Sequence, residues 1–372
     1  MERRQKTQIL KDLEKKMVFI TGPRQSGKTW LAKDIAANFR KPVYLNYDRA
    51  EDRKIIKNES WLNSTDILIF DELHKMKGWK NYLKGVFDTK PENMRIIVTG
   101  SARLATFKKG GDSLAGRFFS HTLLPFSPAE LSETGLEDDL ERFMEHSGFP
   151  EPFLAKDPAD AARWRKQYID GLVRTDILDF EKIQDLRSIE LVLELLRSRV
   201  GSPVSYSSIA EDVGISPNTV KKYIQILEAL YIVFRVTPFT KNVARSLMKE
   251  PKIYFYDTGL VKGDAGAVFE NFAAFNILKS VVARSEAEGI EWELKYLRTK
   301  EKKEVDFCIA KDGSMHRLIE AKYSGENAPS LIYFKKKFNV PATLLVFNLK
   351  RERSESGIEI RSAFSFFKEL YL

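Results

Sequence analysis

Short apolar runs alternate with helix-like spacing through the first third of the chain. After the first run, apolar residues recur at Leu31, Ile35 and Phe39, which is the spacing of a helix that packs on one face. Alternating strands and helices predict a parallel, doubly wound α/β sheet whose functional residues lie at the carboxyl ends of its strands. The runs with the content of buried strands are 17–21, 42–48, 67–70 and 95–98.

The middle of the chain has a different pattern. Proline and glycine punctuate residues 122–153, and a helical stretch over 158–198 then indicates a helical lid beside the first domain. A helix at 207–213, a turn at Gly214 and a second helix opened by Ser216 predict a helix-turn-helix, with a strand-rich wing after it. Such a winged helix either contacts DNA or serves as a packing module.

The last third predicts a long amphipathic helix over 266–285 with Glu270 on its first turn. Two strand-like runs follow, WELKYLRT and KEVDFCIA, and the charged turn KEKK between them is a hairpin signal. A further strand ends at Glu320-Ala321-Lys322.

Length and composition bound the class of protein. A chain of 372 residues with 43% hydrophobic and 30% charged residues is globular and too long for one core. The pattern divides it into a doubly wound α/β core, a helical lid with its linker, a winged helix and a C-terminal α/β domain, at residues 1–130, 131–198, 199–244 and 245–372.

The chain has no apolar run of ~18 residues, no signal-like start and one cysteine, Cys308. These features predict a soluble, cytoplasmic protein without a membrane partner. The net charge of +9 is compatible with a nucleic-acid partner but does not demonstrate one, because no single segment is a basic tail.

The stretch TGPRQSGKTW contains the phosphate-loop pattern of a glycine, four residues and then Gly-Lys-Thr. Glycines let successive backbone N–H groups face phosphates at a helix N-terminus. Lys28 is expected to reach the β- and γ-phosphates, and the Thr29 hydroxyl to ligate Mg²⁺. ATP and Mg²⁺ are therefore the expected cofactors. The predicted nucleotide contacts are Gly22, Pro23, Arg24, Gln25, Ser26, Gly27, Lys28 and Thr29.

Two further strand ends carry candidate chemistry. Asp71 is suited to holding Mg²⁺ through water and Glu72 to polarising the attacking water, although an acidic pair also suits a solvated turn or a helix cap. Thr99 or Ser101, after the next strand, could sense the γ-phosphate, or the segment could be a plain exit from the strand.

Glu320 and Lys322 project to the same face of their strand. Asp306 lies in the neighbouring strand of the hairpin and could approach Glu320. Two converging carboxylates suit Mg²⁺ or Mn²⁺, and a lysine beside them could orient or activate water. Alternating charges on an exposed strand would give the same short pattern.

The motifs GPRQSGKT, IFDEL, VTGSAR and DSLAGRF resemble those of an archaeal and bacterial family of AAA+-type ATPases. The resemblance implies a winged helix and a C-terminal domain similar to PD-(D/E)xK restriction-type nucleases. It also implies an arginine that completes the γ-phosphate site, for which Arg117 is the candidate. If Arg117 acts from a neighbouring subunit, the protein must form a homo-oligomer.

The same resemblance assigns roles in the C-terminal domain. It implies that Asp306 and Glu320 are metal ligands, that Lys322 is the catalytic lysine and that Glu270 is an auxiliary acid on the helix. The resulting hypothesis is an ATPase whose cycle is coupled to binding, and in the active case cleavage, of nucleic acid, with DNA favoured. The alternatives are an ATP-gated DNA-binding switch whose nuclease-like domain does not cleave, and a remodeller of protein partners.

Overall fold

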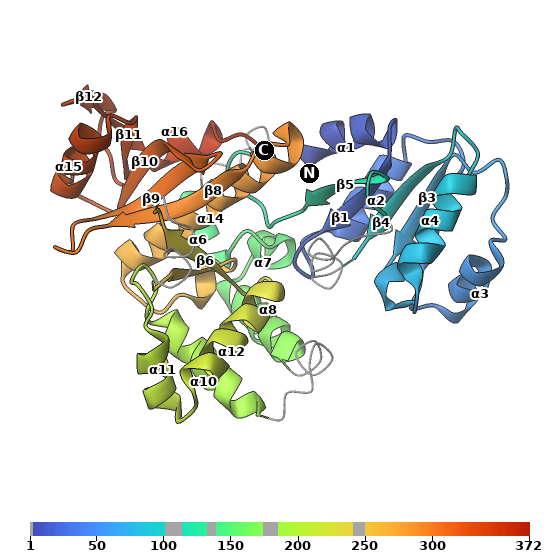
Figure 1. Ribbon diagram of the computed structural model, residues 1–372, viewed down its shortest axis with the longest axis horizontal. Coiled ribbons are helices and arrows are strands. Elements are labelled where there is room, and N and C mark those ends of the chain that lie inside the picture. Colours follow the sequence, from blue (N-terminus) through green and yellow to red (C-terminus); the bar gives the residue numbers. More distant parts are fainter. Residues whose placement is uncertain (1–2, 101–113, 132–138, 174–184, 241–249) are drawn as a thin grey trace. The chain divides into compact units, whose positions relative to one another are not determined.

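A computed structural model describes residues 3–100, 114–131, 139–173, 185–240 and 250–372 (Figure 1). The chain divides into two compact units, Met1–Leu124 and Pro125–Leu372. The expected ATPase core ended at residue 130, six residues after the end of the first unit at Leu124. The finer division of the second unit into a lid, a winged helix and a C-terminal domain stays a prediction.

The first unit is built on a five-stranded parallel sheet with the strand order β2-β3-β4-β1-β5. The predicted parallel α/β sheet is confirmed. β4 lies between β1 and β3, so the strand that precedes the phosphate loop is next to the strand that ends at Thr99. The strands are β1 Met17–Thr21, β2 Pro42–Asn46, β3 Ile67–Asp71, β4 Arg95–Thr99 and β5 Phe118–Thr122.

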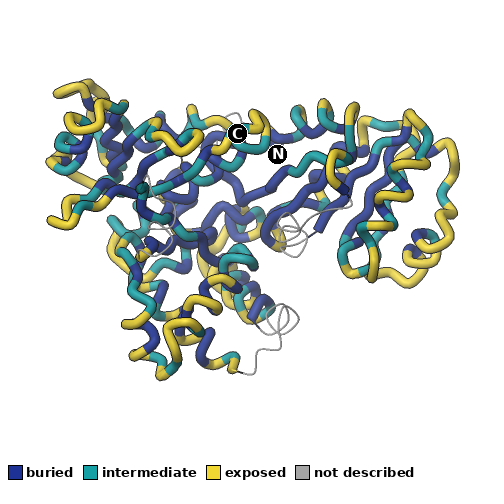
Figure 2. Tube along the Cα trace, in the orientation of Figure 1, coloured by how far each residue is buried: buried dark blue, intermediate teal, exposed yellow. Residues whose placement is uncertain are grey.

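Alternate residues of β1 pack on opposite faces of this sheet. Val18 and Ile20 lie in one apolar core with Leu31 and Ile35, and Phe19 lies in the other. Figure 2 shows the central strands β1, β3 and β4 as largely buried, whereas the helices around them carry exposed residues. The helices of this unit are α1 Gln5–Leu13, α2 Lys28–Ala36, α3 Ala50–Asn58, the short 3-10 helix η1 Leu73–Lys75 and α4 Trp79–Thr89.

The second unit begins with helices. The stretch 122–153, predicted to be rich in loops, contains two short helices. The predicted helical stretch 158–198 contains two described helices, and residues 174–184 between them lie outside the described residues. Asp139 and Pro150 begin the two short helices, the first by accepting a hydrogen bond from the backbone N–H of Arg142. The helices are α6 Leu140–His146, α7 Pro150–Leu154, α8 Pro158–Gly171, α10 Leu186–Arg197, α11 Tyr206–Val213 and α12 Pro217–Ala229.

An eight-stranded sheet with the order β12-β13-β11-β10-β9-β8-β6-β7 completes the second unit. The boundary expected at 244/245 falls outside the described residues, between β6 and β7, which pair with each other. β6 also pairs with β8 through Thr237 and Lys295, so the predicted wing continues the C-terminal sheet. The strands are β6 Val233–Pro238, β7 Lys252–Phe255, β8 Trp292–Arg298, β9 Glu304–Lys311, β10 Ser314–Lys322, β11 Ala342–Val346, β12 Arg353–Glu355 and β13 Ile358–Ser362.

The long helix α14, Ala265–Glu288, packs against this sheet, and Asp264 caps it by accepting the N–H of Ala267. Glu270 was predicted to lie on the first turn of this helix. Because the helix begins at Ala265, Glu270 lies on its second turn. Among the described residues, no helix combines the length and apolar character that a bilayer crossing requires. The remaining elements are the 3-10 helix η4 Thr258–Leu260, α15 Pro329–Phe338 and α16 Ala363–Lys368.

Candidate nucleotide site and a second carboxylate cluster

The phosphate loop joins β1 to α2 and depends on glycine at two positions. Gly22 has φ 139° and Gly27 has φ 94°, both in the region that favours glycine. A Cβ at Gly22 would also lie 2.3 Å from the backbone oxygen of Leu123. The loop therefore packs directly on the chain segment that follows β5, and a side chain at Gly22 would push it away.

Lys28 begins α2 and is buried, with its ammonium folded over the loop. It donates hydrogen bonds to the backbone oxygens of Gly22, at 3.2 Å, and Pro23, at 2.5 Å. Burial lowers the pKa of Lys28 to about 8, although the charges of Asp71 and Glu72 oppose that shift. The ammonium is held by weak carbonyl acceptors, which a triphosphate could readily replace.

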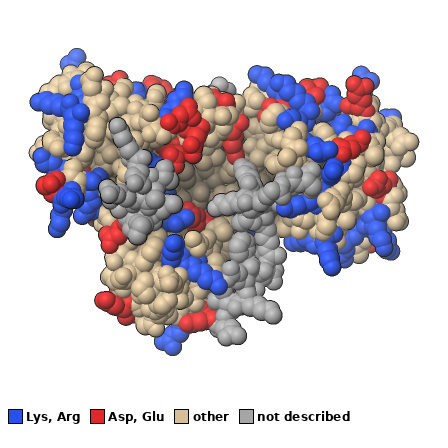
Figure 3. Space-filling view, in the orientation of Figure 1, with Lys and Arg blue, Asp and Glu red and all other residues tan. Residues whose placement is uncertain are grey.

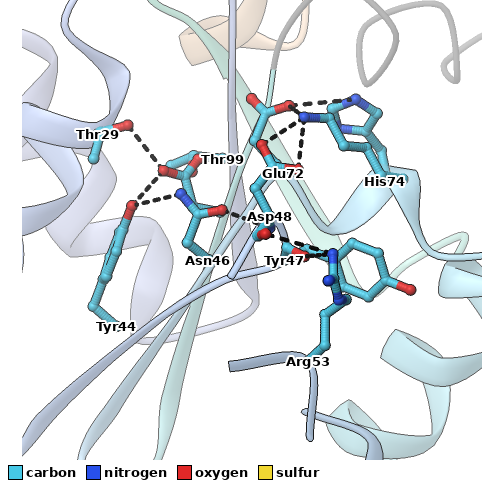
Figure 4. A network of polar contacts seen from close by, with 11 residues as sticks. Thr29, Tyr44, Asn46, Tyr47, Asp48, Arg53, Glu72, His74 and Thr99 are labelled. Carbon is cyan, nitrogen blue, oxygen red and sulfur yellow. Dashed lines mark hydrogen bonds and ion pairs between the residues drawn. The ribbon is translucent and has the colours of Figure 1, made fainter. Parts of the chain in front are cut away.

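Asp71, at the end of β3, is contacted by three side chains, Thr29, Tyr44 and Thr99, which are labelled in Figure 4. Its two carboxylate oxygens accept hydrogen bonds from Thr29, Thr99 and Tyr44, the first two at 3.0 and 2.5 Å. Burial and the bond to Asp71 raise the pKa of Tyr44 well above its ordinary value, so this phenol is a donor. The carboxylate and the Thr29 hydroxyl thus meet at one place, as oxygen ligands of Mg²⁺ would.

Glu72 follows Asp71 with a left-handed backbone, φ 57°, and its N–H donates to the oxygen of Thr99. Its carboxylate lies 3.4 Å from the Lys75 ammonium and 3.7 Å from His74 Nε2. Lys75 in turn donates to both oxygens of Asp48, at 2.9 and 2.6 Å. Burial opposes the charge on Lys75, but the bonds to Asp48 and Glu72 raise its pKa above the usual range.

The other predicted loop residues divide by exposure. Ser26 is buried and donates to the oxygen of Pro23, whereas Arg24 and Gln25 are exposed on the loop. The Arg3 guanidinium donates to the oxygens of Ser26 and Leu124, which fixes the loop from the N-terminal side. Ser101 lies outside the described residues.

Arg117, at the start of β5, forms a two-pronged ion pair with Asp88 of α4. Its Nε and Nη2 lie 2.8 and 3.0 Å from the two carboxylate oxygens. The hydrogen bonds from Arg117 lower the pKa of Asp88. Within this unit, Arg117 is therefore engaged by an acid on the surface, and its role toward a phosphate stays a prediction.

The second carboxylate cluster lies in the C-terminal sheet and contains a lysine that the sequence analysis did not include. The Lys252 ammonium, from β7, lies 2.8 Å from Glu304, 3.1 Å from Glu270 and 3.2 Å from Asp306. The Lys252 side chain is 0% exposed. Tyr254, also on β7, donates to the same oxygen of Glu270 as Lys252 does.

Glu320 and Lys322 form the other half of this cluster, 3.2 Å apart on β10. The register that pairs Ile319 with Phe307 places Glu320 opposite Asp306, as the hairpin predicted. Burial and the charge of Asp306 raise the pKa of Glu320, and the same two causes raise that of Glu270. The sheet therefore brings the four predicted residues into one neighbourhood.

The two sites differ in how well they fit a metal. In the first unit, a hydroxyl and a carboxylate converge beside a glycine cradle, which suits Mg²⁺ bound with a triphosphate. In the second unit, Lys252 already contacts Glu270, Glu304 and Asp306. Within the described part of the chain, no group of three or more His, Cys, Asp or Glu side chains is arranged to hold a metal ion.

Several residues of these sites were missed from the sequence. Tyr44 and Lys252 lie far along the chain from the motifs they serve, and no spacing rule links them. Lys75 follows Glu72 by only three residues, but its contact with Asp48 depends on the folded unit. The signal for Lys252 was its place in KIYFYD, where a charged residue opens an otherwise buried strand.

Comparisons with known proteins agree with the interpretation of the first unit as a phosphate-loop domain. Residues 14–132 match the model of an AAA domain, and residues 137–266 and 265–364 match two domains of unknown function, DUF8612 and DUF4143. The first unit therefore contains an AAA domain, and this domain includes the phosphate-loop motif. The nuclease-like and winged-helix assignments are not reached by these matches.

Relatives and solved structures resemble the chain at low identity. Uncharacterized protein Mb2031c of Mycobacterium bovis is 24% identical over 66% of this chain, which spans only 55% of that protein. Uncharacterized protein MJ1544 of Methanocaldococcus jannaschii is 24% identical over 85% of this chain and 77% of its own length. The Walker-type ATPase PABY2304 of Pyrococcus abyssi aligns at 14% identity and a TM-score of 0.46, over 70% of this chain and 94% of that one.

Proposed function

We propose that the protein binds Mg·ATP at the phosphate loop, hydrolyses it with Glu72, and uses this cycle to control nucleic-acid binding by its second unit. The observation that carries the proposal is the convergence of Thr29 and Thr99 on the Asp71 carboxylate. Three separate elements supply these groups, so the contact depends on the folded sheet rather than on a local turn.

The residues of the loop have distinct parts in this reaction. Gly22 and Gly27 let the backbone approach the phosphates, and Lys28 leaves its carbonyl acceptors to bind their oxygens. When bound, Mg²⁺ neutralises charge on the phosphates, and Thr29 and Asp71 are the residues that would hold it. Glu72 orients the attacking water and accepts its proton.

The second unit supplies the candidate nucleic-acid surface. α11 and α12 follow one another with Ser216 capping the second helix, the arrangement expected of a winged helix. Lys221 and Lys222 are exposed on α12 and are suited to phosphate contacts. The succession α14, β8, β9, β10, α15, β11 supports a restriction-endonuclease-like fold for the C-terminal part.

Charge alone would not select the surface. On the face drawn in Figure 3, basic side chains are interspersed with acidic ones instead of forming one basic patch. Nucleic-acid binding is therefore proposed from the helix pair, with DNA favoured over RNA as the partner.

Cleavage is a second candidate function for the C-terminal part. The observation in its favour is that Glu320 Oε2 is buried without a hydrogen-bond partner, while its other oxygen lies beside Lys322. An open carboxylate oxygen next to a lysine is what metal-assisted hydrolysis requires. The contacts of Lys252 oppose this candidate.

Arg117 is proposed to act on the nucleotide of a neighbouring subunit after leaving Asp88. Mixing Arg117→Ala subunits with Lys28→Ala subunits tests this, because each kind of subunit would supply what the other lacks. Recovery of ATP turnover in the mixture, above that of either variant alone, is expected. Turnover that stays at the sum of the two variants would reject action from a neighbour.

The function as a whole is tested by DNA affinity in different nucleotide states. Fluorescence anisotropy with a labelled duplex would compare the full chain with ATP, with ADP and without nucleotide. The proposal expects affinities that differ at least about tenfold between the ATP and ADP states, a coupling of ~1.4 kcal/mol. With ATP present, Glu72→Gln should keep the DNA affinity of the ATP state, because it hydrolyses ATP slowly. Equal DNA affinities in all nucleotide states would reject the coupling.

A further inference from the structure

The position of Lys252 within the carboxylate cluster carries a conclusion about the C-terminal domain. An ammonium has three N–H donors, and three carboxylates lie within 3.2 Å of this one. The cluster of Glu270, Glu304 and Asp306 thus has a fully buried cation at its centre, and this cation belongs to the chain itself.

Both oxygens of Asp306 and one oxygen of Glu270 are already in use, which leaves Glu320 Oε2 as an open oxygen. Asp306 accepts from Lys252 with one oxygen and from the Ala321 N–H with the other, at 3.2 and 3.1 Å. One oxygen of Glu270 accepts from both Lys252 and Tyr254. Mg²⁺ requires near-octahedral oxygen coordination and usually keeps several waters, so it needs both free oxygens and space.

Space is restricted on the other side of Glu270. A Cβ added at Gly201 would lie 2.7 Å from Glu270 Oε2, so the backbone of this turn presses against the carboxylate. The turn is held in place beside β7 by the bridge between Pro203 and Lys252. Hydrated metal could not enter from this side without moving the turn.

We propose that Lys252 is the resident cation of this cluster, in the place where related folds would hold a divalent metal. The C-terminal domain then keeps the strand and helix framework for binding nucleic acid and does not cut it. This inference rests on the proposed function for the binding role, and it excludes the cleavage candidate. Lys252 is a positioning residue in this account, because it holds the carboxylates and touches no substrate.

The deciding measurement is Mn²⁺ binding to the full chain without nucleotide, by isothermal titration and electron paramagnetic resonance. The chain and Asp306→Asn are expected to bind Mn²⁺ alike, and neither should cut plasmid or single-stranded DNA in Mn²⁺ or Mg²⁺. A Mn²⁺ ion held by the chain and lost in Asp306→Asn would overturn the proposal. DNA scission that Lys322→Ala abolishes would also overturn it.

Removing the lysine gives a converse test. Lys252→Met is expected to bind Mn²⁺ at least about tenfold more tightly than the unaltered chain does. The double variant Lys252→Met/Asp306→Asn is expected to lose this gain in affinity. Lys252→Arg is the matched control, because it retains a cation and should not gain Mn²⁺. A folded Lys252→Met without the gain counts against the proposal, and if this variant does not fold, the comparison with Asp306→Asn decides.

Binding of DNA in the presence of EDTA separates the two levels of the argument. If the chain binds no DNA under any condition, the proposed function fails, while the Mn²⁺ comparison still decides whether Lys252 takes the place of a metal. If DNA binds in EDTA and Mn²⁺ is held through Asp306, only the inference about Lys252 fails.

Discussion

Thr29 and Asp71 are 42 residues apart in the chain, and a 3.0 Å hydrogen bond joins their side chains. The hydroxyl belongs to the first turn of α2 and the carboxylate to the end of β3, so the bond spans the carboxyl edge of the sheet. Thr29 and Asp71 are the residues that would hold Mg²⁺, which would neutralise charge on the phosphates. Because the two side chains already lie together, little ordering would be needed when the nucleotide and its metal bind.

Lys28→Ala should reduce ATP turnover by at least about 100-fold, because it removes the charge aimed at the phosphates. The buried position of Lys28 makes the loss specific, since no neighbouring lysine of the loop can replace it. Phosphate release under saturating ATP is the measurement, with the exposed Lys11→Ala on α1 as the control. Turnover above background in Lys28→Ala would remove the basis of the phosphate-loop assignment.

Glu72→Gln should bind ATP nearly as well as the unaltered chain but hydrolyse it at least about 100-fold more slowly. The amide keeps the size of the side chain and removes its ability to accept a proton. Equilibrium binding of a fluorescent ATP analogue and single-turnover hydrolysis separate the two effects, with the exposed Glu51→Gln as the control. An equal loss of binding and hydrolysis would show that this carboxylate is structural.

Asp48 is expected to affect hydrolysis through Lys75. In Asp48→Asn the Lys75 ammonium loses its closest acceptor and is left to Glu72, whose carboxylate it then holds more closely and turns away from the attacking water. An interaction of about 1 kcal/mol at this half-exposed position corresponds to roughly fivefold in kcat. The double variant Asp48→Asn/Lys75→Met should recover the rate, with the ATP dissociation constant unchanged throughout, and a double variant as slow as the single one would argue against this route.

The pKa of Lys28, about 8, makes ATP binding depend on pH. A bound triphosphate raises this pKa, so a loop whose lysine is neutral must take up a proton when ATP binds. Below about pH 7 the lysine is charged in both states and affinity should be flat, whereas above about pH 8 affinity should fall by up to about tenfold per pH unit. Calorimetry at pH 8.5 in two buffers of different ionisation enthalpy should detect proton uptake, and its absence would place the pKa of the empty loop outside this range.

The phosphate loop could be predicted from the sequence because its chemistry constrains residues that are adjacent in the chain. The loop requires Gly at positions 22 and 27, Lys at 28 and Ser or Thr at 29, and four apolar residues of β1, Met17–Ile20, precede it. Asp71 was predictable for a related reason, since it ends a buried strand of the same parallel sheet.

Lys252 could not be predicted in this way, since its partners are selected by tertiary structure. It lies 54 residues before Asp306, and the pairing of β7 with β6, and of β6 with β8, brings the two into one sheet. The wing strand β6, which was assigned to a separate domain, is the strand that joins β7 and its Lys252 to the C-terminal sheet. Tyr44 was missed similarly, because a tyrosine in an apolar strand carries no sign of the carboxylate it will meet.

Lys279 of α14 and Glu130 form an ion pair in the second unit whose side chains are 3% and 1% exposed. Lys279 also donates to the oxygen of Pro125, at 2.6 Å, so it fastens the first residues of this unit to the long helix. Lys279→Met should destabilise the unit by about 3–5 kcal/mol, because it leaves a buried carboxylate without its charge partner.

The double variant Lys279→Met/Glu130→Leu should lose less than the single one, since neither charge of the pair remains to be desolvated, although the Pro125 oxygen loses its donor. Urea unfolding of the full chain followed by pulse proteolysis measures this, with fragments of the second unit identified by mass and the exposed Lys336→Met as the control. Equal losses in the single and double variants would mean that the pair itself, rather than an unpaired charge, supplies the stability.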